Sequence, residues 1–77
     1  MTEQRLLRRI VTNPKVMLGK PVVKGTRLPV GIIVEKLAYG ETFEDLKRDY
    51  PFLQDDDIRA ALLYAAKRIA LEETYAA

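Results

Sequence analysis

Residues 19–27, with the sequence GKPVVKGTR, contain the residue types that could bind a phosphate group. Glycine-rich phosphate-binding loops follow the pattern G-x-x-x-x-G-K-[ST], in which a lysine directly after the second glycine reaches the phosphates. In this chain five residues separate Gly19 from Gly25, and Thr26 follows Gly25 directly. The spacing therefore excludes this kind of phosphate site. It predicts a turn that uses the tolerance of glycine for positive φ.

Side chains for enzyme chemistry are scarce, because the sequence holds no cysteine and no histidine. Disulfides, thiolate and imidazole metal ligands, and the commonest general base are therefore absent. The remaining aspartates, glutamates, lysines and tyrosines show no pair whose spacing predicts convergence in a cleft. We expect a non-enzymatic protein with no catalytic residues, no cofactor, no metal and no small-molecule substrate.

Three consecutive aspartates at residues 55–57 form an acidic cluster. Adjacent residues at a helix start point in different directions, which disfavours a Mg²⁺ site and favours capping of the helix. The helix itself is predicted by apolar residues at the spacing of one buried face. These residues are Ile58, Ala61, Leu62, Ala65 and Ile69.

Two shorter helices are predicted before this one. The first lies in the segment 28–40 and ends at Gly40, which suits the left-handed residue after a helix. The second begins with Thr42 as its cap, with Asp45 three residues on, and ends at Pro51. Their buried faces are expected to contain Val30, Ile33, Val34 and Leu37 in the first, and Phe43, Leu46 and Tyr50 in the second.

The first part of the chain predicts a small β element. Val22 and Val23 favour one short strand and residues 8–14 a second. Such a pair is barely stable alone, so we expect it to pack on the helices or to pair across a dimer. A chain of 77 residues forms one domain. We divide it into a basic arm and β element over 1–28 and a three-helix core over 29–75, in the order of a helix-turn-helix fold.

The net charge of +2 hides an asymmetry. Residues 1–27 hold seven cations and one anion, whereas residues 28–77 hold six cations and ten anions. A basic front end can attract polyanions or acidic protein surfaces, and solvated cations that only aid solubility are an equally good interpretation. The three aspartates disfavour DNA contact by the start of the last helix. The candidate DNA-binding residues are Arg5, Arg8, Arg9, Lys20, Lys24 and Arg27. For Arg27, a bond to a helix-end carbonyl or a buried carboxylate is an equally good interpretation.

Further apolar residues lie on a second face of the predicted helices. A domain of this size cannot cover two apolar faces, so we expect a homodimer or a partner protein at the second face. In the alternative, the β element folds over it. The candidate interface residues are Ile32, Tyr39, Ala60, Leu63, Tyr64 and Leu71.

No apolar run approaches the roughly 20 residues that a membrane-spanning helix needs. Residues 1–14 also lack the apolar middle of a secretory signal. We therefore expect a cytoplasmic protein with no membrane partner.

The segment from about residue 10 to residue 69 resembles the small prokaryotic domain-of-unknown-function family 433. The shared pattern is G-x-P before G-T-R-x-P-V, a glycine after the first helix, a Y-P turn, and an acidic start to an alanine-rich last helix. Leu18 departs from the smaller residue common in relatives. The matching residues are Gly19, Pro21, Gly25, Thr26, Arg27, Pro29, Val30, Gly40, Tyr50, Pro51, Leu53, Asp57, Ile58, Ala60, Ala61, Tyr64 and Ala65.

The resemblance implies a homeodomain-like three-helix core behind a β element, a tendency to dimerise, and a role as the antitoxin of a toxin–antitoxin pair, often with a PIN-like ribonuclease. It supplies no catalytic residues. We therefore expect an antitoxin-like regulatory domain that binds a PIN-like toxin and, secondarily, double-stranded DNA. The alternative is a pure protein-interaction and dimerisation module that never binds nucleic acid.

Overall fold

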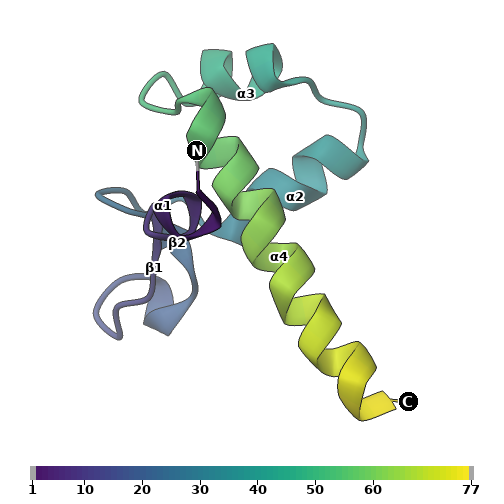
Figure 1. The fold of residues 1–77 in the computed structure, drawn as a ribbon. Helices are drawn as coiled ribbons and strands as arrows, with labels where there is room; N and C mark the ends of the chain where they lie inside the picture. The colour runs from purple at the N-terminus through teal and green to yellow at the C-terminus, as the bar shows by residue number, and fades with distance from the viewer. Residues whose placement is uncertain (1, 77) are drawn as a thin grey trace.

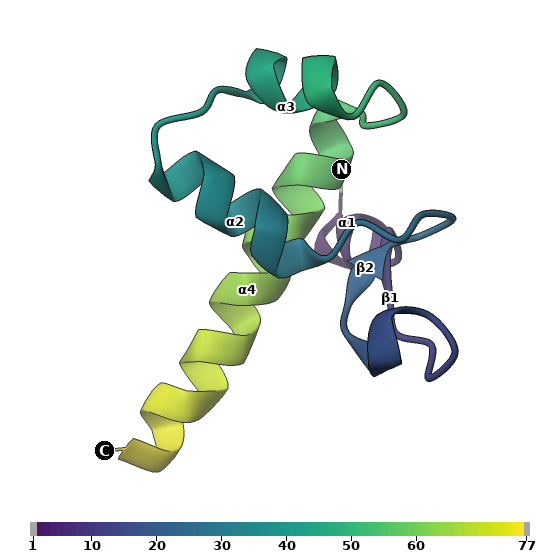
Figure 2. The same cartoon turned by 180° about the vertical axis from the view of Figure 1, so that it is seen from behind.

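The computed structural model describes residues 2–76, and over this range the chain is mainly helical with one short two-stranded sheet, as predicted (Figure 1). Helix α4 is the long axis of the molecule. Helices α1 and α2 pack along its first half, and α3 lies near its start (Figure 2). In chain order the elements are α1 Glu3–Leu7, β1 Ile10–Val11, the 3-10 turn η1 Met17–Gly19, β2 Val22–Val23, α2 Val30–Ala38, α3 Phe43–Asp49 and α4 Asp55–Ala76.

The predicted strand pair is confirmed. Strands β1 and β2 are antiparallel, with Ile10 opposite Val23 and Val11 opposite Val22. Val22 also bridges to Pro29, so β2 has neighbours on both of its edges. Ile10 and Val23 belong to the same buried cluster as the helices. The sheet is therefore stabilised by packing on the helical core, which a two-stranded pair requires.

Helix α1 is an element that the sequence pattern does not predict. Its five residues begin after Thr2, whose side-chain oxygen accepts a hydrogen bond from the Arg5 amide at 3.2 Å. Leu6 packs against the core, and Glu3 pairs with Lys67 of α4 at 2.5 Å. The start of the chain is thus folded against α4 rather than extended as an arm.

The two shorter helices form as predicted. At the start of α3, the Asp45 amide donates to the Thr42 side chain at 3.0 Å, and the Thr42 amide donates to the Asp45 carboxylate at 2.9 Å. Ile33, Leu46 and Ile58 come from α2, α3 and α4 and are fully buried. Burial of side chains of this size contributes about 1.5–3 kcal/mol each, so the contact between these helices is a principal source of stability.

The buried face of α4 differs from the predicted one. Ile58 and Ala61 are buried as expected, but Leu62 and Ile69 are 39% and 53% exposed. Two apolar faces of α4 have helical spacing. Packing against α1 and α2 determines which of the two faces is buried. The prediction for Leu62 and Ile69 is therefore wrong.

Ala60 and Tyr64 occupy the face that is buried instead. Ala60 is fully buried and Tyr64 packs against the core cluster, together with Asp57 and Ala61 at the spacing i, i+3, i+4, i+7. The prediction of Ala60 as an interface residue is therefore wrong. Its small side chain lies in the packed interior of the domain.

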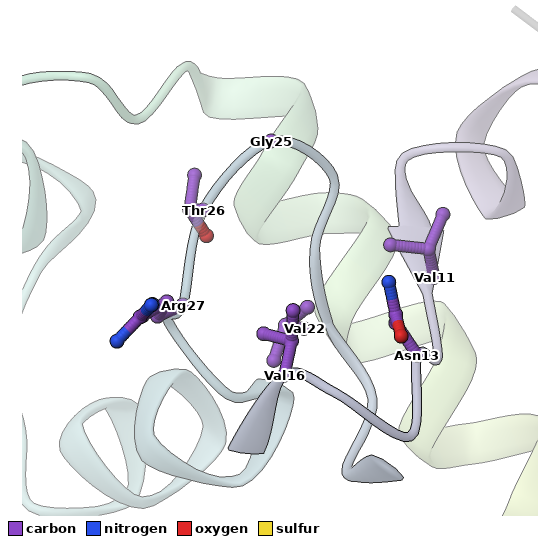
Figure 3. A pocket seen from close by; sticks show the side chains of 7 residues that line it. All are labelled: Val11, Asn13, Val16, Val22, Gly25, Thr26 and Arg27. Atoms are coloured by element: carbon purple, nitrogen blue, oxygen red, sulfur yellow. The ribbon is translucent and has the colours of Figure 1, made fainter. Parts of the chain in front are cut away.

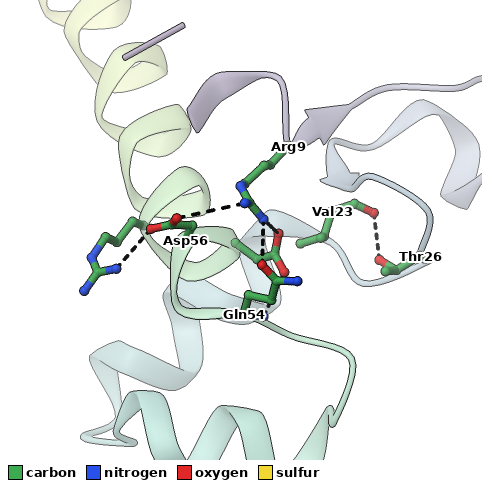
Figure 4. A network of polar contacts seen from close by, with 7 residues as sticks. Arg9, Val23, Thr26, Gln54 and Asp56 are labelled. Carbon is green, nitrogen blue, oxygen red and sulfur yellow. Dashed lines mark hydrogen bonds and ion pairs between the residues drawn. The ribbon is translucent and has the colours of Figure 1, made fainter. Parts of the chain in front are cut away.

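The acidic start of α4 joins it to the β element. Asp57 is only 7% exposed, and its carboxylate accepts hydrogen bonds from Arg9 Nη1 at 3.0 Å and from the backbone N–H of Gln54 at 2.9 Å. Arg9 also lies 3.4 Å from the Gln54 side-chain oxygen and 3.9 Å from Asp56 (Figure 4). One arginine thus holds the residue before β1 against the first turn of α4. We call this contact the Arg9–Asp57 junction.

The other two aspartates have cationic partners of their own. Asp55 lies 2.8 Å from Lys47 of α3, and Asp56 lies 3.0 Å from Arg59 one turn along α4. The hydrogen bond from Lys47 lowers the pKa of Asp55 and raises the pKa of Lys47. The aspartate cluster therefore connects three elements at the start of α4, in addition to the predicted capping of the helix.

Loss of the junction is expected to destabilise the fold. Replacing Asp57 by Ala removes a nearly buried carboxylate and leaves Arg9 without its closest partner, so the free energy of unfolding should fall by about 2–3 kcal/mol. Urea unfolding followed by circular dichroism measures this. The exposed Arg8→Ala variant is the control and should change stability by less than about 0.5 kcal/mol. An equal loss of stability in the two variants would contradict the stabilising role of the junction.

Acid is expected to weaken the two ends of α3. A hydrogen bond from the Thr42 amide lowers the pKa of Asp45, and Lys47 lowers the pKa of Asp55. Because both pKa values are lower in the folded state, their contribution to stability is present above about pH 4 and is lost as the pH falls below it. The melting temperature measured from pH 7 to pH 2 should drop in this window. An Asp55→Asn variant should show a shallower drop, and an unchanged drop would contradict the prediction.

Candidate interaction surfaces

The segment GKPVVKGTR forms a turn, as predicted. Gly25 has a φ of 80°, and the Thr26 hydroxyl donates to the Val23 carbonyl at 2.8 Å while accepting from the Leu28 amide at 3.0 Å. These bonds use both hydrogen-bonding functions of the hydroxyl. The motif therefore shapes the chain between β2 and α2.

A depression of about 570 Å³ lies beside this turn, over an apolar floor that includes Val16 and Val22 (Figure 3). Arg27 contributes to its rim, but its guanidinium points away from the depression in Figure 3. The Arg27 side chain is exposed and forms no ion pair or side-chain hydrogen bond with the described residues. The arginine that bonds a nearly buried carboxylate is Arg9, not Arg27.

Arg9 is a structural residue in this fold. Its guanidinium bonds Asp57 in the junction, so part of its hydrogen-bonding capacity is used within the fold. Its role as a DNA contact stays a prediction. The charge pattern identified it as a cation but gave no sign of a partner 48 residues along the chain.

The other cations of the first part of the chain remain unpaired. Of the seven before Leu28, Arg9 alone forms an ion pair within the described residues, whereas five of the six after it do so. The positive charge of this part is thus not neutralised by the acidic part. We call the following set the unpaired cations: Arg5, Arg8, Lys15, Lys20, Lys24 and Arg27.

The unpaired cations do not form one compact patch. Arg8 caps α1, and Lys24 lies across the ladder from Arg9, to whose carbonyl its amide donates at 2.7 Å. These two share one end of the sheet with the junction. Lys20 precedes β2 at the opposite end. The fold therefore brings Arg8 and Lys24 to the same end and separates them from Lys20.

An apolar groove of about 500 Å³ lies between the η1 turn and the start of α2. Ile32 is one of the predicted interface residues, and its exposed side chain lines this groove together with Met17. Lys20 and Glu35 place opposite charges on its lining. We call it the α2 groove, and its lining residues are Met17, Lys20, Pro21, Pro29, Gly31, Ile32 and Glu35.

The turn beside the groove has an unusual backbone. Met17 and Leu18 have φ values of 49° and 57°, and Gly19 continues in the left-handed region at 81°. Residues with a Cβ rarely adopt this conformation, and strain of this kind is concentrated at functional sites. Leu18 is 93% exposed, so packing within the domain does not explain it. In the sequence, the only unusual feature of Leu18 is that relatives commonly have a smaller residue at this position.

The remaining predicted interface residues are dispersed. Tyr39 is exposed at the end of α2, and Leu71 is exposed near the end of α4. Leu63 and Tyr64 are half-buried on the first half of α4. The predicted set therefore does not form one surface.

A different set of residues forms an apolar stripe on the outer side of α4. Leu62, Ala65, Ala66 and Ile69 follow the spacing i, i+3, i+4, i+7 and therefore share one face of the helix. The second half of α4 extends beyond the rest of the domain in both views (Figures 1 and 2). We call these four residues the α4 stripe.

The architecture is that of a small, mainly helical domain with a two-stranded sheet, in which no described helix has the length and hydropathy to span a membrane. The family model described as "Protein of unknown function (DUF433)" matches residues 10–65, so the chain belongs to this family, as the sequence motifs predict. Its fold is similar to the crystal structure of a DUF433 member protein from Anabaena variabilis. The TM-score is 0.77 and the identity 28%, over 94% of this chain and 71% of that chain.

Two curated relatives are similar in sequence and are named as uncharacterised proteins. Protein y4eO of Sinorhizobium fredii is 41% identical over 59 residues, or 75% of this chain and 27% of the relative. A protein of Archaeoglobus fulgidus is 62% identical over 24 residues, or 31% of this chain and 67% of that protein. The chain thus spans about a quarter of the first relative's length.

Relief of strain at Leu18 should stabilise the protein. Glycine adopts a φ near 57° without the steric cost that leucine incurs, and the exposed Leu18 side chain loses little packing on removal. We expect Leu18→Gly to raise the free energy of unfolding by about 0.5–1 kcal/mol, measured by urea unfolding. Leu18→Ala keeps the Cβ and should leave stability nearly unchanged. A destabilising Leu18→Gly change would show that leucine has a packing role here.

Proposed function

We propose that this chain is a cytoplasmic, non-enzymatic regulatory protein of the antitoxin type, which binds a partner protein through the α2 groove. The observation that carries the proposal is Leu18, an almost fully exposed leucine on a left-handed turn beside an apolar groove. A strained, exposed apolar residue costs stability without benefit to the isolated domain. Burial of Leu18 against a bound partner offsets this cost in stability.

The groove has the composition of a protein-binding surface. Met17 and Ile32 supply exposed apolar area, and methionine adapts its shape to a partner. Lys20 and Glu35 place one cation and one anion at the same groove, which favours a partner segment with complementary charges. This combination suits an amphipathic helix of a toxin such as the PIN-like ribonucleases that the family resemblance implies.

The charged side chains support a non-enzymatic role. Asp45, Asp55 and Asp57 are bound to Arg48, Lys47 and Arg9 in contacts that cap or connect helices. These carboxylates therefore act in folding rather than at a reaction centre.

DNA binding is the second candidate function, and the unpaired cations favour it. Six cations without internal partners in residues 1–27 can neutralise backbone phosphates and release counterions. The order of α2, α3 and α4 supports a helix-turn-helix arrangement, in which residues 50–54 form the turn. Because the aspartates at the start of α4 each have a cationic partner, the repulsion predicted there is weaker than three free charges would give. That end still offers no unpaired cation among residues 55–59.

A growth test examines the antitoxin role. The product of the neighbouring reading frame, expressed alone, is expected to arrest growth of the host, and coexpression of this chain should restore growth. A Leu18→Asp, Ile32→Asp double variant should fail to restore growth, because one charge in the groove and one on the turn beside it oppose burial of this apolar surface. Leu71→Asp, on α4 away from the groove, is the matched control and should still protect. A harmless neighbour product, or protection by the groove variant, would contradict the proposal.

Salt dependence tests the DNA candidate. With about four phosphate contacts, affinity for a random 20-base-pair duplex should fall about 100-fold between 50 and 200 mM salt, measured by fluorescence anisotropy. An Arg8→Ala, Lys24→Ala variant should reduce the salt slope by about two, whereas Arg68→Ala, an exposed cation on α4, should not change it. Absence of binding at 50 mM salt would favour the pure protein-interaction module.

A further inference from the structure

We propose that the depression beside the turn of residues 25–27 binds a small organic carboxylate. The apolar body of the ligand lies on the valines that line the depression, and its carboxylate pairs with Arg27 at the rim (Figure 3). The depression shares no lining residue with the α2 groove, so this site depends on neither the toxin nor the DNA proposed above. The proposal rests on the apolar outer face of the sheet, on unused hydrogen-bond donors at the rim, and on the charge of the lining residues.

The two-stranded sheet presents apolar residues on both of its faces. Ile10 and Val23 belong to the buried cluster that includes the helices. Side chains alternate along a strand, so Val11 and Val22, which are opposite each other in the ladder, face away from that cluster. The outer face of a small antiparallel sheet is usually polar. Here it is apolar and borders the depression, where Val11 remains only half-buried, so it offers a surface for the apolar body of a ligand.

The rim of the depression carries hydrogen-bond donors that have no partner within the described residues. The Arg27 guanidinium and the backbone N–H groups of Gly25 and Arg27 form no hydrogen bond there. The Asn13 side-chain oxygen accepts from the Lys15 amide at 2.9 Å, which leaves the two N–H donors of the Asn13 side chain unused. The Thr26 hydroxyl, in contrast, has both of its functions used within the turn. A ligand group that matches this rim must therefore accept hydrogen bonds.

The charge of the lining residues selects an anionic acceptor. None of the residues that line the depression is acidic, and Arg27 gives the rim one positive charge. A guanidinium donates two parallel N–H groups to the two oxygens of a carboxylate, which fixes the orientation of the pair. The volume of about 570 Å³ lies within the range of small-molecule sites. A carboxylate with a branched or aromatic apolar body therefore fits both parts of the depression.

Arg27 has to turn its guanidinium toward the depression to form this pair. In Figure 3 the guanidinium points away from Val16 and Val22. The side chain is exposed and no described residue holds it in place, so it can change rotamer rapidly. Ordering this side chain lowers the affinity. We therefore expect weak binding, with a dissociation constant of about 1 mM for a ligand of the size of benzoate.

Benzoate tests the class of ligand, with benzamide as an uncharged control of the same shape. In a titration of the isotope-labelled protein followed by two-dimensional NMR, benzoate should shift the amide signals of residues 11–16 and 22–27. Benzamide should bind about tenfold more weakly, because it lacks the charge that pairs with Arg27. Equal affinity for the two compounds, no shift with benzoate, or shifts only outside these residues would overturn the proposal.

Acetate tests the contribution of the valines, because it carries the same charge without an apolar ring. Burial of the ring against the valines should make benzoate bind about tenfold more tightly than acetate in the same titration. Equal affinity for acetate and benzoate would show a contact between charges alone. That result would overturn the proposed site.

Substitution of Arg27 tests the rim. Arg27→Gln should raise the dissociation constant of benzoate about tenfold, because the charged hydrogen bonds are lost. Arg68→Gln, at an exposed position on α4, lowers the net charge equally and should leave the dissociation constant unchanged. Arg27→Lys keeps the charge without the planar pair of donors, so its affinity should fall between those of the wild type and Arg27→Gln. Equal effects of Arg27→Gln and Arg68→Gln on benzoate binding would overturn the proposal.

Discussion

The Arg9–Asp57 junction is the contact on which the arrangement of this small domain depends. It joins the residue before β1 to the first turn of α4, across 48 positions of the chain. Asp57 is nearly buried, so its charge requires a fixed partner, and Arg9 supplies one together with the Gln54 amide. With this contact in place, the sheet and α1 lie against one side of α4. The other side of α4 is left to solvent.

The division of α4 into a covered and an uncovered side explains why the domain displays so much apolar surface. The covered side holds alanines that let α2 approach closely, and the uncovered side holds the α4 stripe. The α2 groove arises separately, where the left-handed turn at Met17 and Leu18 meets the start of α2. The domain therefore exposes two distinct apolar regions, the α4 stripe and the α2 groove. The unpaired cations add positive charge at both ends of the sheet rather than on one surface.

Much of the fold follows from local sequence signals. Thr42 and Asp45 specify the start of α3, Val22 and Val23 specify β2, and the 3.6-residue period specifies α4. The period does not specify which of two apolar stripes on α4 is buried. That choice depends on α1 and α2, which meet α4 only in the folded chain. Helix α1 is too short for a periodic pattern, so its existence also depends on packing against α4.

The candidate sites were less predictable for the same reason. Charge patterning identified six cations, but which arginine bonds a buried carboxylate is decided by a contact distant in sequence, and Arg9 makes it instead of Arg27. Ile32 was found by its helical spacing. The left-handed backbone conformation of Leu18 could not be predicted from the sequence, because leucine rarely adopts it. Such departures from local preference are expected where function, rather than stability, determines the residue.

Hydrogen–deuterium exchange along α4 is the most direct test of the claim that the domain covers the first half of this helix and leaves its second half exposed. Amides of residues 58–65 should be protected, and those of residues 66–73 should exchange fast. Slow exchange in residues 66–73, or equal exchange in the two ranges, would contradict the account.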